Sequence, residues 1–169
     1  MKINLTTLLF LAFVIFFSCK NNSNIIKTKE VAEENLNSIL KKELHLNLTH
    51  SPVYLNPESK PDVVGWKEYI DVQTKVYQLK NITTNKVEKH LTELDLLMTS
   101  LYDSKFPYPL ENQKFRDELD NLSNNIIEAI DLLEEKNLTI LILTDYLNRI
   151  LEAYKSSKNT IRDIYRIKN

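Results

Sequence analysis

Glycine and cysteine are almost missing from this sequence. Its 169 residues contain one Gly and one Cys, whereas average usage would supply about twelve glycines. Phosphate-binding loops, dinucleotide-binding turns and tight turns between strands rely on glycine, because these backbones need a positive φ or a close approach. The scarcity of glycine therefore disfavours nucleotide-binding and β-rich folds and favours an all-α protein.

Several classes of bound partner also lack support. A single cysteine excludes an intrachain disulfide and a cysteine-rich zinc cluster, and a formal charge of -1 gives no basic surface for nucleic acid. The helical Glu-x-x-His metal motif is absent, because Lys42, Asn47 and Val87 stand three residues before the histidines. Those histidines are His45, His50 and His90. We expect no metal, no cofactor and no nucleic-acid partner, and we expect His90 to be a surface or boundary residue.

The N-terminus has the three parts of a signal peptide. Lys2 gives a positive start, residues 8–17 are ten consecutive apolar residues, and residues 20–24 are polar. A membrane-spanning helix needs roughly 20 apolar residues, so this run is short for a stable anchor. We therefore expect residues 1–18 to be removed from the mature protein.

The only cysteine follows the apolar run directly, in the stretch Phe16-Phe17-Ser18-Cys19. Over residues 1–19 the sequence resembles the signal peptides of bacterial lipoproteins, although two phenylalanines replace the aliphatic and small residues of the strictest motif. The resemblance implies cleavage between Ser18 and Cys19, a diacylglyceryl group on the Cys19 thiol, and fatty acylation of the new amino terminus. The alternative is an ordinary secretory signal or a signal anchor, with the cysteine beside it by chance.

The residue after the cysteine indicates in which membrane a lipoprotein is located. In bacteria with two membranes, such lipoproteins usually go to the outer membrane unless an acidic residue follows the cysteine. Lys20 follows here, and residues 20–24 contain no acidic side chain. The resemblance therefore implies an outer-membrane protein whose body faces the periplasm and whose membrane contact is the lipid on Cys19.

The mature chain is expected to form one domain behind a disordered tether. Residues 19–26 are the lipidated cysteine and the tether, and residues 27–169 form the domain. Apolar residues at helical spacing predict a first helix over residues 28–46, and three prolines make residues 47–61 a linker. Residues 62–168 then form the main bundle, with Asp62 as the first N-cap.

Helical periodicity continues through the main bundle. One apolar face runs over residues 62–102 but contains the weak helix formers 81–85, so we expect a kink or break there, or else an elongated bundle. Prolines make residues 103–109 a turn, and further helices are expected over 111–136 and from 138 onward, although residues 138–143 could instead form a short strand. The expected fold is all-α, an antiparallel bundle of four to five helices. The Trp-containing helix, Phe-Pro turn and Asn-Arg-Ile-Leu-Glu-Ala-Tyr helix resemble small helical lipoproteins of bacteria, which implies no activity.

Two aromatic features remain as candidate sites. Trp66 and Tyr69 lie at helical spacing, which favours core positions over the wall of a ligand pocket. Phe106 and Tyr108 belong to the turn Phe-Pro-Tyr-Pro. These rings could cover the end of the core, which we favour, or they could stay exposed as a contact point for a partner.

No catalytic motif stands out in the sequence. Nucleophilic catalysis needs a nucleophile held by a base, and no Gly-x-Ser-x-Gly turn is present. A carboxylate pair for hydrolysis could come from one predicted helix, but its spacing favours a solvated face. The acidic residues concerned are Asp117, Glu118, Asp120, Glu128 and Asp131.

The leading hypothesis is a non-enzymatic module that binds another envelope protein; the alternatives are a small-ligand carrier with a pocket near Trp66 and Tyr69, or a hydrolase.

Overall fold

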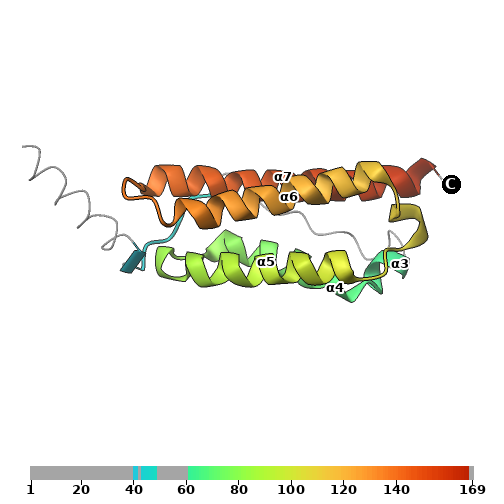
Figure 1. The fold of residues 1–169 in the computed structure, drawn as a ribbon, viewed down its shortest axis with the longest axis horizontal. Coiled ribbons are helices and arrows are strands. Elements are labelled where there is room, and N and C mark those ends of the chain that lie inside the picture. Colours follow the sequence, from blue (N-terminus) through green and yellow to red (C-terminus); the bar gives the residue numbers. More distant parts are fainter. Residues whose placement is uncertain (1–39, 42, 49–60, 168–169) are drawn as a thin grey trace, which may run out of the picture.

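The computed structural model describes residues 40–41, 43–48 and 61–167, and this part of the chain is an antiparallel helical bundle (Figure 1). The all-α prediction is confirmed. The signal peptide, Cys19, the tether, His50, and most of the predicted first helix and linker lie outside the described residues. The helices are α3 (Pro61–Val64), α4 (Lys67–Gln78), α5 (Val87–Asp103), α6 (Gln113–Leu132) and α7 (Ile140–Ile167), with short 3-10 turns η2 (Leu79–Asn81), η3 (Thr84–Lys86) and η4 (Tyr108–Leu110).

The four long helices run up and down in chain order. In Figure 1, α6 and α7 form one layer, and α4 and α5 form the other. Short connections make each helix antiparallel to the next. The α4–α5 joint and the α6–α7 connection therefore lie at one end of the bundle, and the α5–α6 connection lies at the other. The 28 residues of α7 extend about 42 Å at 1.5 Å per residue, so the bundle is elongated.

The predicted break within residues 62–102 is confirmed. Helix α4 ends at Gln78, Ile82 and Thr83 are extended, and α5 starts at Val87. The polar and β-branched residues between them favour local turns over a continued helix. The chain reverses here without a left-handed residue: no described residue has a positive φ.

Two predicted boundaries before this break were wrong. Asp62 lies inside the one-turn helix α3, and α4 begins at Lys67 instead, because the Trp66 N–H donates to the Val63 carbonyl and closes a separate turn. The predicted helix over residues 28–46 does not reach its expected end. Residues 43–48 lie outside any helix, because the Leu46 N–H donates to the Ile82 carbonyl across an isolated β-bridge.

Helices α6 and α7 have identifiable start signals. The Asn112 Oδ1 accepts a hydrogen bond of 3.0 Å from the Phe115 N–H and caps α6. The helix begins at Gln113, two residues after the predicted start at residue 111. The Thr139 Oγ1 accepts from the Ile142 N–H at 3.2 Å at the start of α7. The alternative of a strand over residues 138–143 is wrong, because this capped turn makes the chain helical from Ile140.

The core is a continuous apolar stripe along all four long helices. Its fully buried side chains repeat every three or four residues, as the periodicity predicts. On α6 and α7 the apolar ones are Phe115, Leu119, Leu122, Ile126, Ala129, Leu143, Leu147, Ile150, Leu151 and Tyr154. Within the described part of the chain, no helix is apolar enough over a sufficient length to cross a membrane.

Candidate functional site

Trp66 and Tyr69 lie in a packed aromatic cluster at the end of the bundle where α4 begins. The Trp66 ring stacks on Tyr69 at 5.5 Å between centroids and lies 4.9 Å from Phe106. Its indole N–H donates to the Ser104 Oγ at 2.8 Å. Trp66 is 5% exposed and Tyr69 is fully buried. The two residues therefore occupy core positions. The aromatic rings around them fill the space where the alternative prediction had a ligand pocket.

Polar atoms accompany this cluster deeper in the core. The Tyr154 hydroxyl on α7 donates to the Gln73 Oε1 on α4 at 2.9 Å, and Ser157 donates to the Tyr154 carbonyl at 2.8 Å. Burial raises the pKa of Tyr69 to about 12, and the hydroxyls of Ser157 and Tyr154 offset part of that shift. Tyr69 thus stays protonated at physiological pH, and this polar set ties α4 to α7.

The two aromatic residues of the Phe-Pro-Tyr-Pro turn differ in exposure: one covers the core and the other stays exposed, the two possibilities that the sequence left open. Phe106 is 6% exposed and packs between Trp66 and Phe115, with the Arg116 guanidinium 4.6 Å above its ring. Tyr108, two residues later, is 83% exposed. Phe106 therefore covers the core, whereas Tyr108 projects from the same end of the bundle.

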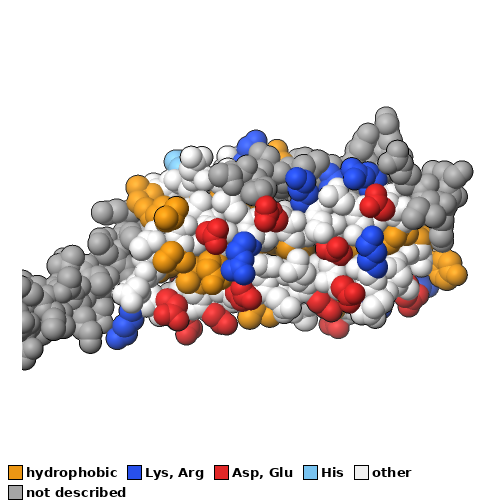
Figure 2. Space-filling view, turned by 90° about the horizontal axis from the view of Figure 1, so that it is seen from above, with side chains coloured by type: hydrophobic (Ala, Val, Ile, Leu, Met, Phe, Trp, Pro, Cys, Tyr) orange, Lys and Arg blue, Asp and Glu red, His pale blue; other side chains and the backbone are white. Residues whose placement is uncertain are grey.

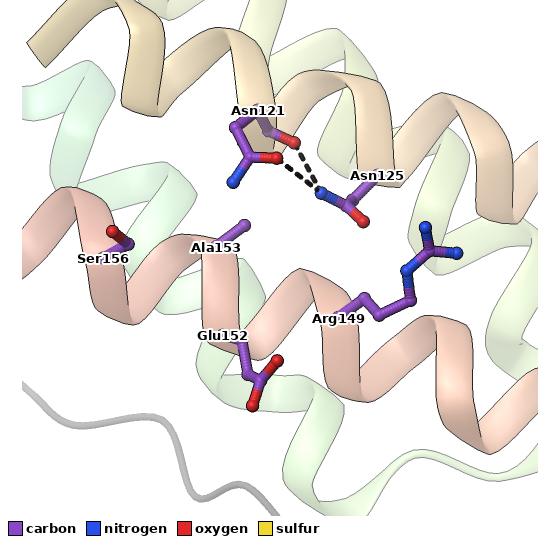
Figure 3. Close-up of a pocket in the computed structure, with 6 residues that line it drawn as sticks. All are labelled: Asn121, Asn125, Arg149, Glu152, Ala153 and Ser156. Carbon is purple, nitrogen blue, oxygen red and sulfur yellow. Dashed lines mark hydrogen bonds between the residues drawn. The ribbon is translucent and has the colours of Figure 1, made fainter. Parts of the chain in front are cut away.

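A groove between α6 and α7 is a site that the sequence did not predict (Figure 3). It is open, has a volume of about 370 Å³, and is lined mainly by polar side chains around the buried Ala153. Its lining residues are Asn121, Asn125, Arg149, Glu152, Ala153 and Ser156. The small side chain of Ala153, between the large buried residues Ile150 and Tyr154 of α7, is a sequence signal that could have indicated a hollow there.

The groove offers hydrogen-bonding groups on both of its walls. The Asn125 side-chain amide donates to the Asn121 backbone carbonyl at 2.7 Å and to the Asn121 Oδ1 at 3.1 Å, and the second bond joins the two side-chain amides on α6. Arg149 on α7 forms an ion pair of 3.1 Å with Glu128, and its guanidinium lies 4.6 Å above the Tyr146 ring. These side chains can recognise a polar ligand by hydrogen bonds.

His90 is buried between α4 and α5, so the expectation of a surface or boundary residue was wrong. Its ring is 8% exposed, and its Nε2 lies 2.9 Å from the Lys75 carbonyl, to which it donates a hydrogen bond. Burial and the Lys75 cation lower the pKa of His90 to about 4, although the carbonyl contact and Glu93 act in the opposite direction. Lys75 itself pairs with Glu93. His90 is therefore a neutral structural residue near pH 7.

The other candidate ligands and acids are dispersed over the surface. His45 is exposed and pairs its backbone with Thr83. The acidic residues of α6 have local partners: Asp117 accepts from Gln113, and Asp120 accepts from Tyr102. Among the described residues, no three His, Cys, Asp or Glu side chains are grouped to hold a metal ion. The α6 carboxylates thus form the solvated face that their spacing favours.

Comparison of the chain with protein-family models, with curated proteins and with solved structures found no match. The functional assignment therefore depends on the chemistry of the chain itself.

Proposed function

We propose that this protein is a lipid-anchored lipoprotein of the bacterial envelope that acts by binding another envelope protein, without catalysis. The anchor is the diacylglyceryl group on Cys19, left at the N-terminus after cleavage behind Ser18. The body faces the periplasm from the outer membrane. Two or more acyl chains hold a protein firmly on a membrane, because each buried methylene contributes about 0.8 kcal/mol.

The anchor is tested by substituting Cys19. Cys19→Ala should abolish labelling by a fatty-acid analogue and release the protein into the soluble fraction of lysed cells. Ser23→Ala, in the same polar segment, is the matched control and should be labelled and retained like the wild type. Membrane retention of Cys19→Ala without label would mean that the apolar segment itself is an uncleaved anchor.

The observation that carries the binding role is the contrast between Phe106 and Tyr108. Phe106 is fixed in the aromatic cluster, and Pro107 and Pro109 restrict the backbone on either side of Tyr108. The backbone that carries this tyrosine, which is 83% exposed, is thereby restricted. Exposed aromatic side chains with little conformational entropy to lose are typical centres of protein interfaces.

A photo-crosslinking amino acid at position 108 tests this role in intact envelopes. We expect one dominant adduct, which added wild-type protein suppresses and added Tyr108→Ala protein does not. The matched control is the same crosslinker at Leu96, which is 64% exposed on α5. Equal adducts from both positions, or equal competition by both proteins, would refute a specific contact at Tyr108.

The groove between α6 and α7 supports a second candidate function, a carrier of a small polar ligand. Asn121, Asn125 and Arg149 supply donors and acceptors around an open hollow, whereas aromatic rings fill the space around Trp66 and Tyr69, where the alternative prediction had a ligand pocket. A thermal-shift screen of sugars, amino acids and short peptides tests this candidate. A true ligand should raise the melting temperature of the wild type and leave that of Arg149→Ala unchanged; no shift with any compound would count against a carrier.

A further inference from the structure

Helix α7 begins with three consecutive apolar residues that the bundle leaves partly outside. Leu141 is 80% exposed, and Ile140 and Ile142 are between one third and two fifths exposed. Leu143, the next residue, is fully buried. Single exposed apolar residues are ordinary on protein surfaces, but a contiguous group of this kind marks a contact surface.

A fourth exposed apolar side chain lies at the same end of the bundle. Leu44 is 38% exposed, and its carbonyl accepts a hydrogen bond from the Thr84 N–H at the α4–α5 joint. That joint and the start of α7 share one end of the antiparallel bundle. We call the group Leu44, Ile140, Leu141 and Ile142 the apolar end. Hydrophobic side chains gather toward the left of the face seen in Figure 2, which is the end that carries the α6–α7 connection in Figure 1.

The chain enters the bundle at this same end. The Leu46 N–H donates to the Ile82 carbonyl, and the His45–Thr83 bridge fixes the segment beside the α4–α5 joint. Cys19 precedes Leu44 in the sequence, so the part of the chain that carries the proposed lipid joins the described bundle at this end. Tyr108 and Trp66 lie at the opposite end, beside the α5–α6 connection and the start of α4.

We propose that the apolar end inserts into the surface of the lipid bilayer and holds the bundle upright, with Tyr108 pointing away from the membrane. The inference rests on the proposed function in one respect, since the lipid on Cys19 brings the protein to the bilayer. The backbone at the start of α7 suits an interfacial position. Thr139 accepts from the N–H groups of Ile142 and Leu143, so these amides need no water.

The charges around the apolar end indicate which lipids it fits. Glu134, Glu135 and Lys136 are exposed in the α6–α7 connection, and Lys86 pairs with Glu43 at 3.7 Å. Lys41 and Lys80 are also exposed at this end, so its described residues mix acidic and basic groups and do not form a purely basic surface for anionic headgroups. Apolar insertion into a zwitterionic surface therefore fits this end better than electrostatic binding to anionic lipid.

Quenching of tryptophan fluorescence by brominated lipid tests the orientation. The full lipidated chain is reconstituted into phosphatidylcholine vesicles with and without brominated acyl chains, as the wild type, Leu141→Trp or Leu96→Trp. Side chains of an interfacial segment lie roughly 5–10 Å into the headgroup and acyl boundary, so the indole at position 141 should lose about half of its emission. The buried Trp66, at the far end, and the indole at the exposed position 96 of α5 should lose almost none.

The outcomes separate this inference from the proposed anchor. Equal quenching of the Leu141→Trp and Leu96→Trp proteins would overturn the inference, even if Cys19 carries lipid. The inference would also be overturned if Leu141→Trp showed a blue-shifted emission that bromine does not quench, together with a dimer in chemical crosslinking. That result would mean that the apolar end binds a second copy of the chain. Bromine quenching at position 141 in protein that takes up no fatty-acid label would support the inference while refuting the anchor.

Discussion

His90 makes the stability of the bundle depend on pH in a way that the structure specifies. Burial lowers the pKa of its ring to about 4 from an ordinary value of 6.5, and the neighbouring Lys75 acts in the same direction. The unfolded chain therefore binds a proton between these two values that the folded chain does not. Stability rises with pH wherever the unfolded state binds more protons, so this contribution is complete above about pH 6.5 and is lost as the pH falls toward 4.

The magnitude follows from the two pKa values. A difference between 6.5 and about 4 corresponds to at most about 3 kcal/mol at full protonation, and to about 2.5 kcal/mol at pH 4.5. The ring sits beside the Lys75–Glu93 ion pair, whose carboxylate is 42% exposed and brings solvent screening close to the imidazole. We therefore expect an observed loss of about 1.5 kcal/mol between pH 7.5 and pH 4.5.

Urea unfolding of the wild type and His90→Gln across this pH range is the assay. The glutamine amide can still donate to the Lys75 carbonyl but does not titrate, and the acid titration of all carboxylates is common to both proteins. The free energy of unfolding of the wild type should fall by about 1.5 kcal/mol more than that of His90→Gln. Parallel pH profiles, or a wild type that gains stability relative to the variant on acidification, would refute the buried neutral histidine.

Three further predictions concern the aromatic end, a helix cap and the polar core. Phe106→Ala should lower the free energy of unfolding by about 3 kcal/mol in urea titrations, since it leaves a cavity beside the Trp66 ring; Tyr108→Ala should change it by less than about 0.5 kcal/mol, and equal effects would contradict the division of roles. Asn112→Ala should cost about 1 kcal/mol because the α6 cap is lost, and an unchanged midpoint would contradict that cap. Tyr154→Phe should cost about 1 kcal/mol through loss of its hydrogen bond to Gln73, which differential scanning calorimetry can measure; an unchanged melting temperature would contradict that bond.

The sequence predicts the helices well because their stability depends on a repeating apolar stripe. The buried residues Phe115, Leu119, Leu122 and Ile126 follow the spacing of an amphipathic helix, and the weak helix formers at 81–85 mark a real reversal of the chain. Helix boundaries are less predictable. The start of α4 follows from the turn that the Trp66 backbone N–H closes with the Val63 carbonyl, and the extended segment at residues 43–48 depends on backbone pairing with residues far along the chain.

The candidate sites are harder to predict because exposure is a property of the packed molecule. Phe106 and Tyr108 are two aromatic residues in one turn, and nothing in their spacing assigns one to the core and the other to solvent. The groove arises where the small Ala153 faces the amides of α6 across a helix interface. His90 carries no motif, and its burial follows from the position of the Lys75 carbonyl on the neighbouring helix.

The mass of the intact protein purified from its own membranes tests the central claim most directly. The proposed anchor predicts a chain that begins at Cys19 and carries a diacylglyceryl group together with a fatty acid on its amino terminus. Mild alkaline hydrolysis should then remove the ester-linked acyl chains and leave the protein part intact. An unmodified chain, or one that still contains residues 1–18, would contradict a lipid-anchored protein.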